Sequence, residues 1–175
     1  MRRFRMRQRL LTLRDRFRIR DADGEIAYAV RGRLISLRDR LLFEDADGRD
    51  LLEVRQRLVA WRPQYRIFRE GRLAAIVSKR LLSVLGSRFV ISLRGGGKLL
   101  AKGNFFDYEY RFLRGRDQVA QVSKRWFTLA DTYGVQIEDE ELDELLVLAC
   151  AVVIDMINHN PERNEPEQPD QDDDD

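Results

Sequence analysis

Much of the chain alternates between apolar and charged residues, which is the pattern of half-buried β-strands. In the segment YEYRF (108–112), the two tyrosines and Phe112 would face inward, while the charged residues between them face solvent. The same period of two recurs in FRIR (17–20), EIAYAV (25–30) and FVISL (89–93). We therefore expect antiparallel strands, each with one buried face, up to about residue 137.

Glycine-containing turns separate these strand-like runs. The sequence DADG occurs at 21–24 and again at 45–48. Asp-Gly is a favoured two-residue hairpin turn because glycine tolerates positive φ. Further turn signals are EG (70–71), GGG (95–97) and RGRD (114–117). The pattern predicts a string of hairpins, with a two-residue turn at each DADG.

Two hairpin-like segments of equal length resemble each other. YRIFREGRLAAIVSKR (65–80) and YRFLRGRDQVAQVSKR (110–125) lie 45 residues apart and both end in VSKR. A propeller needs four or more blades of about 45 residues, so this chain of 175 residues is too short for one. A closed or nearly closed barrel fits better, because closure removes exposed sheet edges.

The pattern changes at residue 138, where EDEELDELLVLACAVVIDMINHN begins. Six of its first seven residues are acidic, which suits the positive end of a helix dipole. Leu145 to Ile154 are then all apolar, so a helix here would be buried on every side. The run is short for a membrane span and is interrupted by Asp155. We expect a helix from about 140 to 157, enclosed by the strands.

Two adjoining motifs carry a family resemblance: VSKRWFTLADTYGVQI (122–137) and DELLVLACAVVID (143–155). This arrangement resembles the LURP-one-related proteins, which share the tubby C-terminal-like fold with phospholipid scramblases. The resemblance covers roughly residues 5–158. It implies a mostly β fold, an antiparallel closed barrel of about twelve strands around a buried hydrophobic C-terminal helix.

The resemblance implies little about function. Tubby-type domains bind phosphoinositide headgroups, and scramblases act on phospholipids. No motif in this chain matches the headgroup-binding residues of tubby proteins. Kinship of fold alone is a weak argument for lipid binding.

Charge divides the chain into a basic body and an acidic tail. Residues 161–175 hold eight acidic residues and one arginine, a net charge of −7, and the remaining 31 basic and 22 acidic residues give residues 1–160 a net charge of +9. The tail has three prolines and no aromatic residue, so it cannot bury enough apolar surface to fold. We expect one domain over 1–160 and a disordered acidic tail over 161–175.

The compartment is expected to be the cytoplasm, with attachment at the membrane surface as one option. The basic N-terminus lacks the apolar core of a secretory signal, and the single cysteine, Cys150, rules out an internal disulfide. No transmembrane span is expected, because no stretch of 18 apolar residues occurs.

Candidate anion-binding residues fall in two places. The first is the repeated VSKR, where strict alternation puts Lys79 and Lys124 on the core faces of their strands, so the two could share an anion. Alternatively, duplicated hairpins simply kept duplicated edge residues. The second is the N-terminus, which has nine arginines in its first twenty residues, although the favoured interpretation of these is a solvated first strand with a basic outer face. The residues concerned are Lys79, Arg80, Lys124, Arg125, Arg2, Arg3 and Arg5.

Catalytic, metal and cofactor sites have no support in the sequence. GGGKLL (95–100) lacks the spacing of a phosphate loop, and DADG lacks the remaining ligands of a calcium loop. His159 is the only histidine, and Cys150 lies within the apolar run without a basic neighbour. Strand aromatics could stack bases but more often form core; those considered are Trp61, Tyr108, Tyr110 and Trp126.

The sequence thus favours a non-enzymatic binding or scaffold module. Its expected ligand is an anionic phospholipid headgroup at the cytoplasmic face of the membrane. Two alternatives stay open: a basic protein associated with nucleic acid, and an intracellular enzyme with an unrecognised site. No cofactor is expected for any of them, and protein partners cannot be named.

Overall fold

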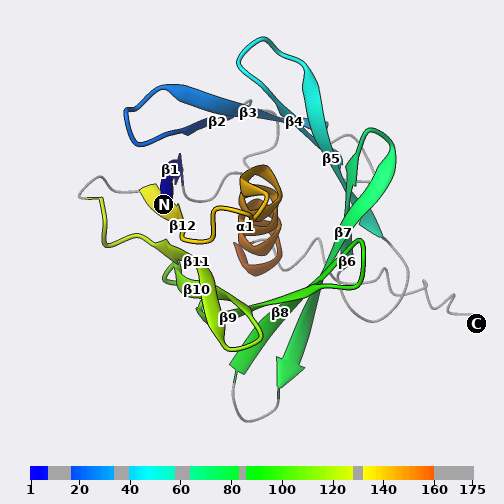
Figure 1. Ribbon diagram of the computed structural model, residues 1–175, viewed down its shortest axis with the longest axis vertical. Coiled ribbons are helices and arrows are strands. Elements are labelled where there is room, and N and C mark those ends of the chain that lie inside the picture. Colours follow the sequence, from blue (N-terminus) through cyan, green and yellow to red (C-terminus); the bar gives the residue numbers. More distant parts are fainter. Residues whose placement is uncertain (8–16, 34–39, 58–63, 83–85, 128–131, 160–175) are drawn as a thin grey trace, which may run out of the picture.

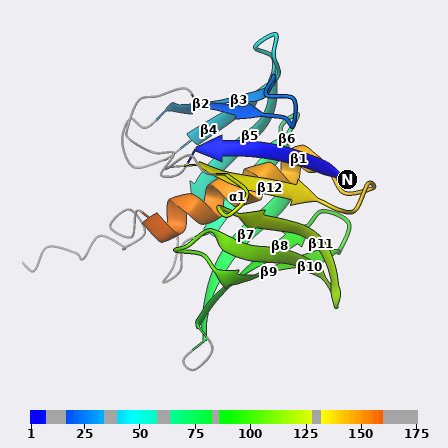
Figure 2. The same cartoon turned by 90° about the vertical axis from the view of Figure 1, so that its left-hand side faces the viewer.

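The described residues form a twelve-stranded β-barrel with one helix along its axis (Figures 1 and 2). The computed structural model describes residues 1–7, 17–33, 40–57, 64–82, 86–127 and 132–159. The strands are β1 (Arg2–Arg7), β2 (Phe17–Arg20), β3 (Ile26–Arg33), β4 (Arg40–Glu44), β5 (Asp50–Arg57), β6 (Gln64–Arg69), β7 (Arg72–Leu82), β8 (Gly86–Leu93), β9 (Lys98–Asn104), β10 (Glu109–Arg114), β11 (Asp117–Ser123) and β12 (Thr132–Ile137), and the helix is α1 (Glu144–His159).

Every strand pairs antiparallel with its neighbours in sequence, and the first strand closes the barrel on the last. In β1 and β12, Arg2 lies opposite Ile137 and Arg7 lies opposite Thr132. Closure gives every described strand a neighbour on both sides, which is the physical reason that favoured a barrel. The predicted fold class is therefore confirmed.

Helix α1 fills the lumen, where the inward faces of the strands surround it (Figure 1). The run Leu145–Ile154 is buried, and so are the residues from Asp155 to Asn158. The helix begins at Glu144, later than the predicted start near 140, because Asp143 caps it. The Asp143 carboxylate accepts the amide N–H of Leu146 at 3.2 Å. Most of the acidic residues therefore precede the helix and lie outside its first turn.

The DADG turns have three-residue loops, so the predicted two-residue turn is wrong. In the first turn, the amide of Asp21 donates to the carbonyl of Glu25 at 3.0 Å, and Gly24 takes a φ of 87°. The Asp21 carboxylate accepts the amides of Asp23 and Glu25 at 3.0 and 2.9 Å. These side-chain bonds stabilise the longer loop, and the strand pairing shifts by one residue next to it.

The repeated segments are duplicated hairpins, which supports an architectural origin for the repeat. One is β6 with β7 and the other is β10 with β11, and each turns at a glycine with positive φ, Gly71 or Gly115. Tyr110 and Phe112 face the core as predicted. Tyr108 is also buried, but it belongs to the turn before β10 and has a φ of 53°.

Candidate anion-binding cleft

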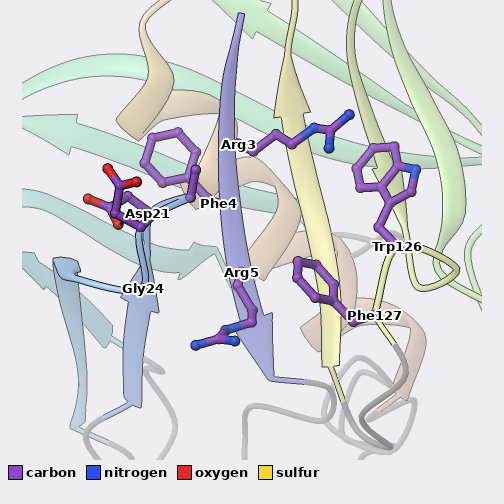
Figure 3. Close-up of a pocket in the computed structure, with 9 residues that line it drawn as sticks. Arg3, Phe4, Arg5, Asp21, Gly24, Trp126 and Phe127 are labelled. Atoms are coloured by element: carbon purple, nitrogen blue, oxygen red, sulfur yellow. Dashed lines mark hydrogen bonds between the residues drawn. The ribbon is translucent and has the colours of Figure 1, made fainter.

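Strand β1 closes the barrel unevenly, and a cleft lies beside it (Figure 3). β1 pairs with β12 at every position from Arg2 to Arg7, whereas among the described residues it pairs with β2 only at Arg5. The cleft has a volume of about 400 Å³. Its lining comes from three parts of the chain: Arg3 to Arg5 of β1, Asp21 to Gly24 of the turn after β2, and Trp126 with Phe127 after β11.

Arg3 and Arg5 supply the positive charge of the cleft. They alternate in β1 with Phe4 and Met6, which are buried, so both arginines lie on the outer face, roughly 7 Å apart along the strand. Arg3 donates from Nε to Oε1 of Gln136 at 2.7 Å. The side chain of Arg5 has no hydrogen-bond or ion-pair partner among the described residues. The terminal nitrogens of both guanidinium groups can therefore donate to a ligand.

Trp126 and Phe127 form the aromatic wall of the cleft. Figure 3 shows Arg3 extending toward Trp126, and its guanidinium carbon lies 5.5 Å from the centre of that ring. Both aromatic rings rest on Gly134 of β12, where a Cβ atom would lie 2.6 Å from Trp126 and 2.8 Å from Phe127. The glycine is therefore required for this wall. Trp126 was expected in the core, and that expectation is wrong, because the ring packs on the outside of the barrel.

The two VSKR lysines have different partners. Lys79 points to the interior, where its Nζ donates to Oδ1 of Asn158 at 3.2 Å and lies 6.0 Å from the centre of the Phe89 ring. Burial lowers the pKa of Lys79. Lys124 follows the end of β11, and its exposed Nζ lies 3.4 Å from Asp107. The alternation that would turn Lys124 inward ends with the strand.

The remaining predicted cations are also outside the cleft. Arg80 is exposed on β7, opposite Arg88 of β8. Arg125 is 81% exposed on its side chain and lies 3.7 Å from Glu109. Among the described residues, no hydrogen bond or ion pair joins Lys79 and Arg80 to Lys124 and Arg125. Of the seven predicted anion-binding residues, Arg3 and Arg5 line the cleft.

Arg2 holds the start of the central helix. Its Nη1 donates to Glu144 at 2.6 Å and its Nη2 donates to the carbonyl of Leu142 at 2.9 Å. Glu144 also accepts a 2.6 Å hydrogen bond from the hydroxyl of Tyr28. Burial, reinforced by this bond, raises the pKa of Tyr28. Arg2 therefore contacts the first turn of α1 from β1, and this network accounts for its charge without a ligand.

Sequence reasoning missed Asp21, Asp23, Phe127 and Gly134 as parts of a site. The adjacent Trp-Phe pair held one signal, because the sequence pattern treated this segment as extended, and neighbouring residues of an extended segment cannot both face the core. The rest depends on which strands meet at the barrel closure, and no local pattern encodes that. Trp61 lies outside the described residues, and so do the side chain of His159 and the acidic tail 161–175.

Groups suited to catalysis or metal binding are poorly placed where the structure describes them. Cys150 is buried at the centre of α1, and burial raises the pKa of its thiol. Within the described ranges, no cluster of three or more His, Cys, Asp or Glu side chains could hold a metal ion.

Comparison with known proteins identifies the family. The family model described as "LURP-one-related" matches residues 2–155, which is most of the chain. The chain belongs to the LURP-one-related family. It is 33% identical over 157 residues to the Bacillus subtilis (strain 168) protein YxjI, which is named as uncharacterized. That alignment covers 90% of this chain and 94% of the relative.

A solved structure supports the same fold for this LURP-one-related chain. An X-ray structure of a protein from Arabidopsis thaliana superposes with a TM-score of 0.65 and 16% sequence identity. The match covers 89% of this chain and 91% of the plant chain. At this identity the likeness concerns the barrel and its central helix alone. In the part of the chain that the structure describes, no helix is both long enough and apolar enough to cross a membrane.

Proposed function

We propose that this LURP-one-related protein is a non-enzymatic binding module that holds the phosphate of an anionic phospholipid headgroup at the cytoplasmic face of the membrane. One observation carries the proposal: Arg3 and Arg5 line the same cleft as Trp126 and Phe127. No catalytic step and no cofactor form part of it.

The chemistry of the lining fits a lipid phosphate. Arginine presents several N–H donors in a planar group that matches phosphate oxygens, and Arg5 has no competing partner among the described residues. Tryptophan favours the boundary between water and lipid, because one part of its ring is apolar and its N–H is polar. Two arginines that line the same cleft as Trp126 and Phe127 would therefore combine phosphate binding with shallow contact to a membrane surface.

Vesicle sedimentation tests this proposal. The full chain is mixed with vesicles of an uncharged galactolipid, with or without phosphatidylglycerol, and in parallel with nonspecific DNA at the same salt concentration. We expect binding to the vesicles that contain phosphatidylglycerol and weaker binding to DNA. Tighter binding to DNA would instead support the nucleic-acid alternative.

Charge-matched variants assign any binding to the cleft. Arg3→Gln with Arg5→Gln removes two charges from it, while Lys102→Gln with Arg111→Gln removes two exposed charges from facing positions on β9 and β10. We expect the first pair to weaken vesicle binding at least about tenfold more than the second, because two charge-assisted contacts are lost. Equal losses would mean that only net charge matters, and the cleft would be the wrong site.

The lysine pair is a further comparison. If Lys79 and Lys124 shared an anion, Lys79→Gln with Lys124→Gln would weaken binding more than the change of Arg3 and Arg5. Lys79 contacts Asn158 and Lys124 contacts Asp107, so the two lysines have separate partners. We therefore expect the change of the lysine pair to weaken vesicle binding less than the change of Arg3 and Arg5.

A further inference from the structure

The two DADG turns share a backbone but differ in charge. In the second turn, as in the first, the leading aspartate accepts the amides two and four residues further on: Asp45 accepts those of Asp47 and Arg49 at 2.9 and 2.8 Å. The guanidinium of Arg49 then lies 3.9 Å from the Asp45 carboxylate and 3.8 Å from that of Asp47. Both aspartates of the second turn are thus close to a counter-charge that the turn itself supplies.

The first turn has no counter-charge within ion-pair distance of its carboxylates among the described residues; Arg20, which precedes it, donates to the carbonyl of Gly24 at 2.6 Å. Glu25 takes the place of the arginine, so the charged side chains of residues 21–25 are all acidic. Asp21 and Asp23 have no ion-pair partner among the described residues. This turn, unlike the second, lines the cleft beside β1.

The cleft therefore holds two unpaired charges of each sign. Arg3 and Arg5 line it together with Asp21 and Asp23, and no ion pair joins the arginines to the aspartates in the described structure. A purely anionic ligand would be attracted by the arginines and repelled by the aspartates. A ligand that carries both charges would be attracted by both.

We propose that the cleft selects an aminophospholipid, with the headgroup phosphate at Arg3 and Arg5 and the headgroup ammonium at Asp21 and Asp23. The proposal rests on the proposed lipid-binding function and specifies its ligand. A primary ammonium offers three donors, and the aspartate carboxylates offer acceptors that the turn does not fully use. Phosphoethanolamine and phosphoserine headgroups have this pairing of phosphate and ammonium, and phosphoglycerol lacks the ammonium.

Lipids of equal net charge provide the main test. Phosphatidylserine and phosphatidylglycerol each carry one net negative charge, but only the first has an ammonium group. Vesicles of each, at equal mole fraction in an uncharged galactolipid background, are titrated with the full chain. We expect about three- to tenfold tighter binding to phosphatidylserine, the effect of one or two partly exposed ion pairs. Free phosphoethanolamine and glycerol phosphate, titrated by calorimetry, repeat the comparison without a membrane.

The duplicated turn supplies a matched control. Asp21→Asn with Asp23→Asn removes the negative charge from the cleft but keeps the side-chain oxygen that accepts the turn amides. Asp45→Asn with Asp47→Asn makes the same change in the turn outside the cleft. We expect the first pair to abolish the preference for phosphatidylserine and the second pair to leave it intact.

The outcomes separate this proposal from the one on which it rests. Equal binding of the two lipids, still dependent on Arg3 and Arg5, would overturn the aminophospholipid assignment and leave the lipid-binding function standing. Loss of preference in both aspartate variants would also overturn it, because the effect would then be one of net charge. Binding of free phosphoethanolamine without binding of phosphatidylserine vesicles would exclude a lipid as the source. Absence of vesicle binding altogether would defeat both proposals.

Discussion

The hydroxyl of Tyr108 donates a 2.6 Å hydrogen bond to the carboxylate of Asp155, which ties the barrel wall to the last turns of the central helix. Both residues are buried, at 3% and 4% exposure. The turn before β10 aims Tyr108 inward, and Gly103 permits this turn because a Cβ there would lie 2.4 Å from the carbonyl oxygen of Glu109. Tyr133 of β12 stacks on Tyr108 with 4.7 Å between ring centres.

Replacing Tyr108 by phenylalanine should destabilise the protein. The change leaves Asp155 buried with one donor fewer, and losing a partner from a buried polar group costs about 1–3 kcal/mol. Urea denaturation of Tyr108→Phe measures the loss. The matched control is Tyr133→Phe, because the Tyr133 hydroxyl is buried with no hydrogen-bond partner in the part of the chain that the structure describes. That change should be neutral or slightly stabilising, and equal losses in the two variants would show that the bond to Asp155 contributes nothing.

A charge in the middle of the central helix should prevent folding. Ala149 is fully buried within α1, so Ala149→Arg would place an unpaired charge in the barrel lumen, which costs several kcal/mol. We expect insoluble or unfolded protein, measured by soluble yield and circular dichroism. Ala22→Arg, at an exposed turn position, should fold normally. A soluble Ala149→Arg protein with a cooperative unfolding transition would contradict the central position of the helix.

The barrel and its helix could be predicted because their signals are local. Period-two alternation in segments such as FRIR and FVISL reflects one buried face, and the apolar run Leu145–Ile154 reflects burial on all sides. The length of the DADG loops could not be predicted from these local patterns. It depends on Asp21 and Asp45 bonding amides two and four residues ahead, and Asp-Gly alone does not specify this.

The cleft could not be assembled from the sequence. Its arginines were singled out by their abundance, but the walls come from the turn after β2 and from Trp126, more than 100 residues further along the chain. Trp126 lies near β1 because β12 is between them and its Gly134, opposite Arg5, leaves room for the indole ring. Alternation also fails for Lys124, because the strand ends one residue before it.

Stability should fall at alkaline pH. Burial is the first cause of raised pKa values for Tyr110 and Tyr133, whose usual value is 10.0, and for the thiol of Cys150, whose usual value is 9.0. At alkaline pH the folded protein therefore keeps protons that the unfolded chain releases. The stability of the folded protein is unaffected by these groups below about pH 9 and falls as the pH rises above that value. Each fully buried group contributes a slope of up to about 1.4 kcal/mol per pH unit.

Lys79 has the opposite effect on the pH dependence of stability. Its pKa is lowered by burial, so the unfolded chain binds more protons and stability gains as pH rises toward 10.5. The gain in stability from this one lysine is set against the losses from the two tyrosines and Cys150, so we expect a net loss of stability as the pH rises. Urea midpoints between pH 7 and 11, with tyrosinate absorbance as a second signal, measure it. Tyr133→Phe should make the decline shallower, and a midpoint that is constant to pH 11 would contradict the burial of these groups.

The acidic tail should compete with anionic ligands. The body carries +9 and residues 161–175 carry −7, and the tail begins two residues after α1 ends at His159. A tethered segment reaches an effective concentration of roughly millimolar, whereas each exposed contact is weak and is screened over about 8 Å at physiological salt. A chain ending at Asn160 should therefore bind anionic vesicles more tightly than the full chain at low salt, and the difference should shrink as salt is added. Sedimentation of both proteins over a salt series measures this. Identical affinities at low ionic strength would show that the tail does not compete and affects only solubility.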